Sequence, residues 1–234
     1  MPTDNFTVLL GPLAGLRIPI PDRDTWTDSI KLGTYEPEML AIVIEEAGAE
    51  KIMLDIGAHI GLFSCAWAMR GGKAIAFEML PEHCALLQRV VADNDLNGID
   101  IKNIAVLDEC CRRLARVNRR SLSTSILSVV EGFELRGPFV DRIHRQSEAI
   151  NVDCISIDSL QLETVDLIKI DVEGAEAAVL AGAVRTLGCH RPILLVEVHS
   201  IECGMKVTRL LSPLYGEPVR IMTTPSGIIQ TVWR

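Results

Sequence analysis

Short apolar runs of strand length alternate along this chain with longer segments that have helical spacing. Such alternation predicts right-handed crossover connections and a mostly parallel sheet covered by helices on both faces. The expected strands are residues 51–56, 74–77, 101–106, 166–170 and 192–198. The expected helices are residues 37–47, 62–69, 81–93 and 175–187.

The last two strand-like runs break this alternation. Residues 218–223 and 228–233 are separated only by the four residues from Thr224 to Gly227, which is too short for a crossover helix. We therefore expect these runs to pair as an antiparallel hairpin. The chain is predicted to have an α/β fold, in which a doubly wound, mostly parallel, seven-stranded sheet ends in that hairpin.

The first 36 residues lie outside the alternating pattern. Two extended pieces, 6–10 and 16–20, are separated by glycine and proline and predict an N-terminal hairpin or cap. Residues 37–234 are expected to form the main domain. Within it, residues 112–150 hold eight arginines and four acidic residues and predict an inserted segment. A solvated basic face is its simpler interpretation, and contact with an anionic substrate is the alternative.

Composition excludes several classes of protein. The chain of 234 residues has a net charge of −8, which disfavours nucleic acid as a partner. No run approaches the roughly 18 uncharged residues of a membrane helix, and no export signal begins the chain, so we expect a cytoplasmic protein without membrane contact. The seven cysteines include no CxxC pair, which argues against a disulfide framework or zinc ribbon.

A glycine-rich turn, DIGAHIG over residues 55–61, joins an expected strand to an expected helix. Such a turn lets the backbone approach a ligand closely. It lacks the third glycine of the dinucleotide motif, and Asp55 would repel a pyrophosphate, so a nicotinamide cofactor is disfavoured. Glu78 ends the next strand, where a carboxylate accepts both hydroxyls of a ribose. The two acids together fit a positively charged nucleoside without phosphates, and S-adenosylmethionine matches that description.

Four stretches of the chain resemble the FkbM-type S-adenosylmethionine-dependent methyltransferases. They are residues 33–38 (GTYEPE), 54–64 (LDIGAHIGLFS), 76–78 (AFE) and 167–176 (LIKIDVEGAE). Shorter matches at 180–183, 191–192 and 196–199 extend the resemblance over about residues 33–200. It implies the Rossmann-like class I methyltransferase fold.

The resemblance also implies a set of cofactor contacts. Ribose contact is expected at Glu78 and adenine-side contact near Ala105 and Val106. The other expected cofactor-binding residues are Glu36, Asp55, Gly57, Ala58, His59, Gly61, Met79 and Asp171. Two of them depart from the family's pattern, since His59 stands where asparagine is more common and Met79 replaces a proline. We interpret His59 as lining the cofactor and not as a base.

Candidate catalytic residues follow the two later strands. Asp171 and Glu173 come after the strand that ends at residue 170, and Glu197 and His199 share one face at the end of the next strand. His199, Asp171 or Glu173 could accept a hydroxyl proton. The alternatives are an ion pair between Asp171 and Lys169 and a purely structural histidine. These side chains could also hold magnesium, but their spacing defines no coordination sphere, and we assign no metal ligand.

We therefore expect an S-adenosylmethionine-dependent O-methyltransferase. The resemblance implies a small hydroxylated acceptor of the sugar or natural-product type. One alternative is a binding module that keeps the cofactor site without transferring a methyl group. A second alternative is a nicotinamide-dependent oxidoreductase.

Overall fold

The computed structural model describes residues 5–20, 25–117, 127–128, 148–224 and 227–234. Contacts divide the chain into two compact units. Unit 1 comprises residues 1–103 and 164–169, and unit 2 comprises residues 104–163 and 170–234. Most of the expected basic insertion at 112–150 lies outside the described residues.

The main sheet has seven strands in the order β12-β13-β11-β10-β3-β4-β5. β3, β4 and β5 run parallel, whereas β13 is antiparallel to both β11 and β12. Their bounds are β3 (Ile52–Ile56), β4 (Lys73–Phe77), β5 (Ile99–Lys102), β10 (Leu167–Ile170), β11 (Ile193–Val198), β12 (Arg220–Thr223) and β13 (Ile229–Trp233). This order and the closing hairpin confirm the predicted fold class, a mostly parallel α/β sheet.

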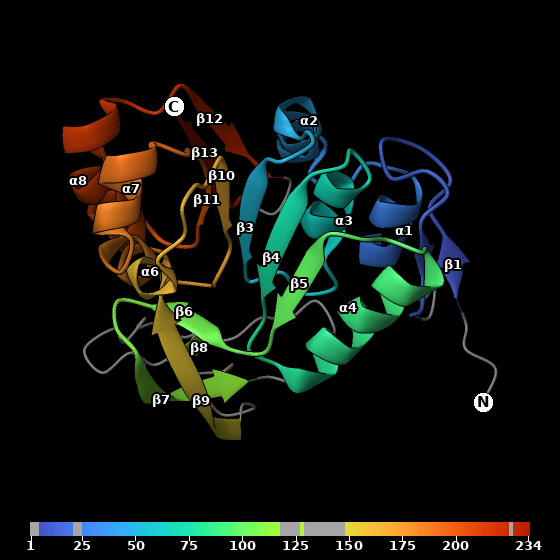
Figure 1. The fold of residues 1–234 in the computed structure, drawn as a ribbon, viewed down its shortest axis with the longest axis horizontal. Coiled ribbons are helices and arrows are strands. Elements are labelled where there is room, and N and C mark those ends of the chain that lie inside the picture. Colours follow the sequence, from blue (N-terminus) through green and yellow to red (C-terminus); the bar gives the residue numbers. More distant parts are fainter. Residues whose placement is uncertain (1–4, 21–24, 118–126, 129–147, 225–226) are drawn as a thin grey trace. The chain divides into compact units, whose positions relative to one another are not determined.

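Two helices of unit 1 begin at a proline. Pro37 and Pro81 stand at the first helical position of α2 and α4, where a missing amide hydrogen costs nothing. Figure 1 shows α3 beside β4 and α4 beside β5. The helices are α1 (Thr25–Lys31), α2 (Pro37–Glu46), α3 (Leu62–Ala68) and α4 (Pro81–Asp93), and the N-terminal strands, which pair antiparallel, are β1 (Phe6–Thr7) and β2 (Arg17–Ile18).

The core of unit 1 is built around α3 and β3. Six of the seven residues of α3 are buried, and Trp67 is fully covered. The Trp67 ring packs against Gly72, where a side chain would collide with it. Gly61, at the start of α3, would likewise collide with Leu87 of α4 if it carried a side chain. The absence of a side chain at Gly61 therefore lets two helices approach each other.

Unit 2 adds a second sheet of four strands in the order β6-β9-β7-β8. β7 pairs antiparallel with β8 and with β9, and β6 pairs parallel with β9. Its strands are β6 (Ala105–Leu107), β7 (Cys111–Val117), β8 (Leu127–Ser128) and β9 (Glu148–Ser156). Its helices are the 3-10 helix η1 (Ile157–Leu160) and the α-helices α6 (Glu176–Ala181), α7 (Val184–His190) and α8 (Ile201–Tyr215).

Two expected elements were wrong in their extent. The strand expected at 101–106 is two strands, because the chain leaves β5 at Asn103 and resumes as β6 at Ala105. The helix expected at 175–187 is two helices, α6 and α7. Gly182 separates them, and a side chain there would collide with the Leu107 backbone.

Two helices, α1 and α8, were not expected from the sequence. Among the described residues, no helix combines the length and the apolar character that crossing a bilayer requires.

Candidate functional site

The residues expected to bind or react fall into two groups, one in each unit. Unit 1 holds Glu36, Asp55, Gly57, Ala58, His59, Gly61, Glu78 and Met79. Unit 2 holds Ala105, Val106, Asp171, Glu173, Glu197 and His199.

Asp55 lies on β3 and has no solvent exposure. Its Oδ2 accepts hydrogen bonds from the hydroxyl of Ser64 at 2.6 Å and from the Ser64 amide at 3.1 Å. Its Oδ1 lies 3.9 Å from the Nζ of Lys169, whose side chain is 4% exposed. The Asp55 carboxylate thus binds the first turn of α3 and balances a buried lysine, and its contact with a cofactor stays a prediction.

The glycine turn is tied to the end of β4. The amides of Gly57 and Ala58 both donate to the carbonyl of Phe77, at 2.9 and 3.0 Å. Gly57 and Gly61 both have φ of 79°, in the left-handed region where glycine is favoured. These bonds place the turn beside the residue that follows β4, which is Glu78.

Glu78 is held in one orientation by the backbone around it. Its Oε2 accepts the His59 amide at 2.9 Å and its Oε1 accepts the Leu80 amide at 2.8 Å, and only 4% of the residue is exposed. Burial alone would raise the pKa of Glu78, but the contact with His83, 3.7 Å away, and the Leu80 amide bring that pKa below its ordinary value. Glu78 is therefore a fixed, negatively charged acceptor.

Three rings line up beside this carboxylate. The His59 ring centroid lies 5.3 Å from that of Trp26 and 4.3 Å from that of His83. His59 has φ of 53°, a left-handed conformation that asparagine and histidine adopt more readily than most residues. Histidine in place of the more common asparagine at position 59 is therefore compatible with the backbone conformation of this turn.

The remaining expected cofactor residues are more scattered. Glu36 immediately precedes α2 and has φ of 38°. Met79 is half-buried, and its carbonyl accepts a hydrogen bond from Asn103 at 3.0 Å. Ala105 and Val106 lie on β6 of unit 2, paired with β9, and so belong to a different sheet from β4.

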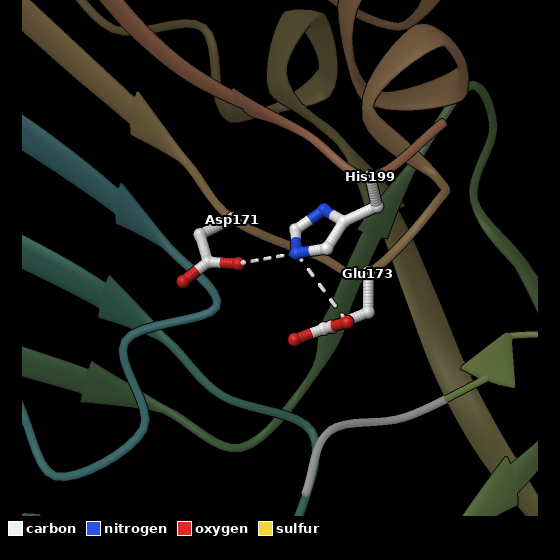
Figure 2. Close-up of side chains that lie close together, drawn as sticks. All are labelled: Asp171, Glu173 and His199. Atoms are coloured by element: carbon white, nitrogen blue, oxygen red, sulfur yellow. Dashed lines mark ion pairs between the residues drawn. The ribbon is translucent and has the colours of Figure 1, made fainter. Parts of the chain in front are cut away.

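In unit 2 the ends of two strands bring the expected catalytic side chains together. Asp171 follows β10 directly, and His199 follows β11. The Nε2 of His199 lies 3.3 Å from Oε2 of Glu173 and 3.6 Å from Oδ1 of Asp171. Figure 2 shows both carboxylates directed at this one nitrogen.

Glu197 approaches the same nitrogen from β11. Its Oε1 lies 3.5 Å from Nε2 of His199, and its Oε2 accepts a hydrogen bond from Gln230 of β13 at 2.9 Å. Glu197 and Gln230 stand opposite each other in the antiparallel register. The closing hairpin therefore helps to orient this carboxylate.

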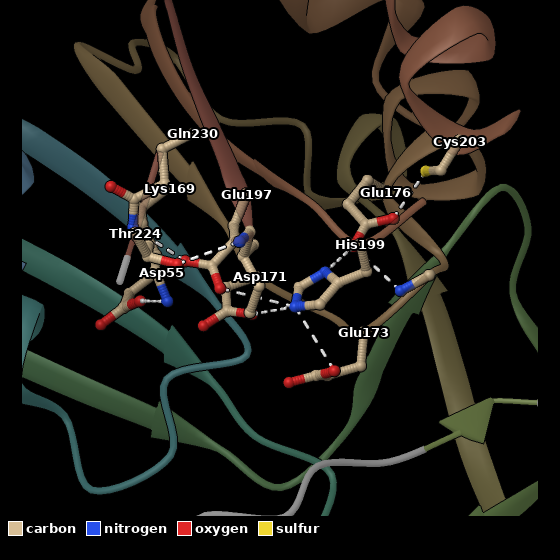
Figure 3. A network of polar contacts seen from close by, with 12 residues as sticks. Asp55, Lys169, Asp171, Glu173, Glu176, Glu197, His199, Cys203, Thr224 and Gln230 are labelled. Atoms are coloured by element: carbon tan, nitrogen blue, oxygen red, sulfur yellow. Dashed lines mark hydrogen bonds and ion pairs between the residues drawn. The ribbon is translucent and has the colours of Figure 1, made fainter. Parts of the chain in front are cut away.

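Glu176 is a member of the cluster that the sequence did not reveal. It is fully buried in the first turn of α6, and its Oε1 lies 2.6 Å from Nδ1 of His199 and accepts the Gly174 amide at 2.9 Å. Its Oε2 accepts from the Cys203 thiol at 2.7 Å (Figure 3). The alanines on either side of Glu176 were the only sequence signal of its burial, because they predict a buried helix face.

The carboxylates around His199 control its charge. Burial opposes the charged imidazole, but the close carboxylates of Glu173, Glu176 and Glu197 outweigh that effect and raise the pKa of His199 well above its ordinary value. Burial and the Glu176 charge likewise raise the pKa of the Cys203 thiol to about 12. In this arrangement His199 holds its proton at neutral pH, and its role as a base stays a prediction.

The family model described as "Methyltransferase FkbM domain" matches residues 55–217. No curated protein matches the chain.

Several solved structures share the fold. A methyltransferase FkbM from Methylobacillus flagellatus KT has a TM-score of 0.57 at 18% identity, over 91% of this chain and 56% of that one. A putative rRNA methylase from Clostridium thermocellum has a TM-score of 0.52 at 10% identity, over 85% and 94% of the two chains. The tRNA (uracil-54, C5)-methyltransferase of Pyrococcus abyssi, in complex with S-adenosyl-L-homocysteine, has a TM-score of 0.50 at 16% identity, over 93% and 41%. This chain thus spans little more than half the length of the first structure, and at these identities the likeness concerns the fold.

Proposed function

The chain belongs to the FkbM methyltransferase family, and we propose that it transfers the methyl group of S-adenosylmethionine to a hydroxyl oxygen of a small acceptor molecule. Family and fold support S-adenosylmethionine-dependent methylation. That the acceptor atom is oxygen and that the acceptor is a small molecule goes beyond what family and fold support. It depends on the carboxylate–histidine cluster of unit 2 and on the net charge of −8, which disfavours a nucleic-acid acceptor.

The residues of unit 1 fit the adenosine part of this cofactor. Glu78 is charged and is fixed by two backbone amides, at 2.9 and 2.8 Å, which leaves its remaining lone pairs to accept the two hydroxyls of a ribose. We assign ribose binding to Glu78. Asp55 acts indirectly, because its bonds to Ser64 hold the start of α3 and with it the glycine turn.

The cluster of unit 2 fits the acceptor side of the reaction. Bound S-adenosylmethionine supplies an electrophilic methyl group and a neutral thioether leaving group. The acceptor oxygen forms a bond to the methyl carbon as the carbon–sulfur bond breaks, and the hydroxyl proton must pass to a base. Asp171 and Glu173 are suited to accept it, because their side chains are 20% and 32% exposed and both carry oxygens beside His199.

The observation that carries this proposal is the convergence of Asp171, Glu173 and Glu197 on a single ring nitrogen, within 3.3 to 3.6 Å. Such a cluster can hold a hydroxyl in one orientation and receive its proton. Alignment of the reacting atoms supplies much of the rate in a transfer of this kind.

One observation favours a second candidate, a chain that keeps the fold without transferring a methyl group. Both acids of unit 1 are almost fully buried and bonded to their own surroundings, Asp55 to Ser64 and Glu78 to two amides.

Calorimetric titration with S-adenosylmethionine and with NAD tests which of the two cofactors the protein binds. Transfer of labelled methyl to a panel of sugars and other polyhydroxylated molecules tests the reaction.

We expect S-adenosylmethionine to bind, NAD not to bind, and label to appear in an ether-linked methyl group of one acceptor. Binding of NAD alone would refute the proposal. A labelled product methylated on carbon or nitrogen would contradict oxygen as the acceptor atom.

A further inference from the structure

We propose that Asp171, Glu173 and His199 form a binding site for one divalent cation of the magnesium or manganese type. Each residue offers one ligand atom, and these atoms all lie within 4.8 Å of one another. All three belong to unit 2, so the site is complete within one compact part of the chain.

The spacing of the ligand atoms suits a small cation. His199 Nε2 lies 3.3 Å from Oε2 of Glu173 and 3.6 Å from Oδ1 of Asp171. Two ligands bound about 2.1 Å from a metal are separated by about 3.0 to 3.4 Å, depending on the angle between them. Small side-chain rotations therefore suffice to bring these atoms into a coordination sphere.

The imidazole nitrogen that faces the carboxylates is an independent indication of a ligand. The His199 side chain is 8% exposed, and its Nε2 is buried without a hydrogen bond among the described residues. Buried polar atoms are normally satisfied, and an exception calls for an explanation. A cation between Nε2 and the two carboxylate oxygens satisfies this nitrogen.

The other side of the ring is arranged as in known metal sites. Nδ1 lies 2.6 Å from Oε1 of the fully buried Glu176. Metal-binding histidines commonly donate their second ring hydrogen to a carboxylate, which fixes the tautomer and directs the free nitrogen at the metal. Binding of the cation displaces the proton from Nε2. With its remaining hydrogen on Nδ1, His199 then directs the lone pair of Nε2 toward Asp171 and Glu173.

The charges of the cluster also favour a cation. Asp171, Glu173, Glu176 and Glu197 carry four negative charges, against at most one positive charge on His199. Close carboxylates repel one another, and a divalent ion offsets that repulsion. Two carboxylate ligands with one imidazole match magnesium or manganese better than zinc or copper sites rich in sulfur and nitrogen.

The role of the ion rests on the proposed function, whereas its binding does not. A divalent cation acts as a Lewis acid, so an acceptor hydroxyl bound to it loses its proton more easily. The carboxylate oxygens that do not bind the ion remain available to accept that proton.

The test uses manganese chloride with the full chain after treatment with a chelator. Free Mn²⁺ is followed by electron paramagnetic resonance, which requires no activity. The variants are Asp171→Asn and Glu173→Gln. The matched control is Glu202→Gln, which removes an acidic side chain of α8 that is 71% exposed and lies 2.7 Å from Lys206.

We expect one Mn²⁺ per wild-type chain, displacement of Mn²⁺ by excess magnesium, and a loss of at least about tenfold in affinity in both site variants. The control should bind as the wild type does. Circular dichroism checks that each variant is folded. If Asp171→Asn does not fold, Glu173→Gln, at a more exposed position, still tests the site.

Absence of binding at about 1 mM Mn²⁺, or equal affinity in all four proteins, would overturn the metal site. Titration of the same samples with S-adenosylmethionine separates the two proposals. Binding of Mn²⁺ without S-adenosylmethionine contradicts the proposed function and supports the site. Binding of S-adenosylmethionine without Mn²⁺ contradicts the site and supports the cofactor assignment.

Discussion

The Nδ1 atom of His199 lies 2.6 Å from Oε1 of Glu176, a carboxylate with no solvent exposure. Glu176 belongs to the helix that follows β10, and His199 follows β11, so this contact ties two neighbouring crossovers together. It also decides which ring nitrogen faces the other carboxylates. The buried glutamate therefore fixes the orientation of the His199 ring.

Replacement of His199 tests that cluster. We expect His199→Gln to lower kcat by about 100-fold or more, because the variant loses the group on which three carboxylates converge. The Kd for S-adenosylmethionine should change by less than about twofold. Transfer of labelled methyl gives kcat, calorimetry gives Kd, and circular dichroism checks the fold. An unchanged kcat in a folded variant contradicts the assignment.

Replacement of Glu78 tests ribose binding. Glu78→Gln keeps the shape of the side chain but removes its charge, and charged hydrogen bonds are worth about 1.5–3 kcal/mol. We expect the Kd for S-adenosylmethionine to rise about tenfold or more. Glu50→Gln is the matched control, because that side chain is 86% exposed and pairs with Lys73. Equal affinities in the two variants would remove Glu78 from the cofactor site.

Replacement of Asp55 should change the stability of the fold more than the affinity for S-adenosylmethionine. Asp55→Ala leaves the Nζ of Lys169, now 3.9 Å from that carboxylate, as an uncompensated buried charge. Loss of one partner from a buried pair costs about 3–5 kcal/mol. We expect urea unfolding to show a loss of this size.

The double variant Asp55→Leu with Lys169→Met separates the charge from the packing. It removes both charges and should recover most of the lost stability. A double variant as unstable as Asp55→Ala would mean that the hydrogen bonds to Ser64, and not the charge of Lys169, account for the effect.

Asp158 gives a prediction about pH. Its carboxylate accepts the amides of Arg185 and Thr186 and the hydroxyl of Thr186, each at 2.8 Å, at the start of α7. Burial raises its pKa, but these bonds and the Arg185 charge outweigh that effect and lower it. Removal of such a cap costs about 1 kcal/mol, so Asp158→Ala should be less stable than wild type by this amount at neutral pH.

The sign of the pH effect follows from the lowered pKa. The folded state prefers charged Asp158, so its contribution is complete above the ordinary aspartate pKa and disappears as the pH falls through the lower folded value. Urea midpoints of wild type and Asp158→Ala should therefore converge in acid. Asp153→Ala, at a side chain that is 75% exposed, is the control. A difference that persists in strong acid contradicts the capping role.

Much of the fold could be predicted because local signals agree with it. Proline marks the starts of α2 and α4. The four residues between the expected runs 218–223 and 228–233 are too few for a crossover, and β12 and β13 do form a hairpin. α8 could not be assigned in this way, because Pro213 lies inside it. The helix exists nonetheless, since Ser200 accepts the Cys203 amide at its start and Cys203, Val207 and Leu211 are buried at a helical spacing.

The cluster of unit 2 was partly predictable for a different reason. Parallel strands that lie side by side end at the same edge of a sheet, so Asp171 and His199 could be expected near each other. Glu176 was not expected there, because a glutamate in the first turn of a helix is ordinarily an exposed partner of the helix dipole and its flanking alanines were only a weak signal of burial. The buried state of Asp55 was also missed, since its partners Ser64 and Lys169 lie 9 and 114 positions away.

The neighbouring rings of Trp26, His59 and His83 give the protein a natural optical probe. Trp67 and Trp233 are almost completely shielded from solvent, whereas Trp26 is half-buried and lies 5.3 Å from His59 of the glycine turn. Its indole emission should therefore respond when that turn receives a ligand, so occupancy could be followed without any label.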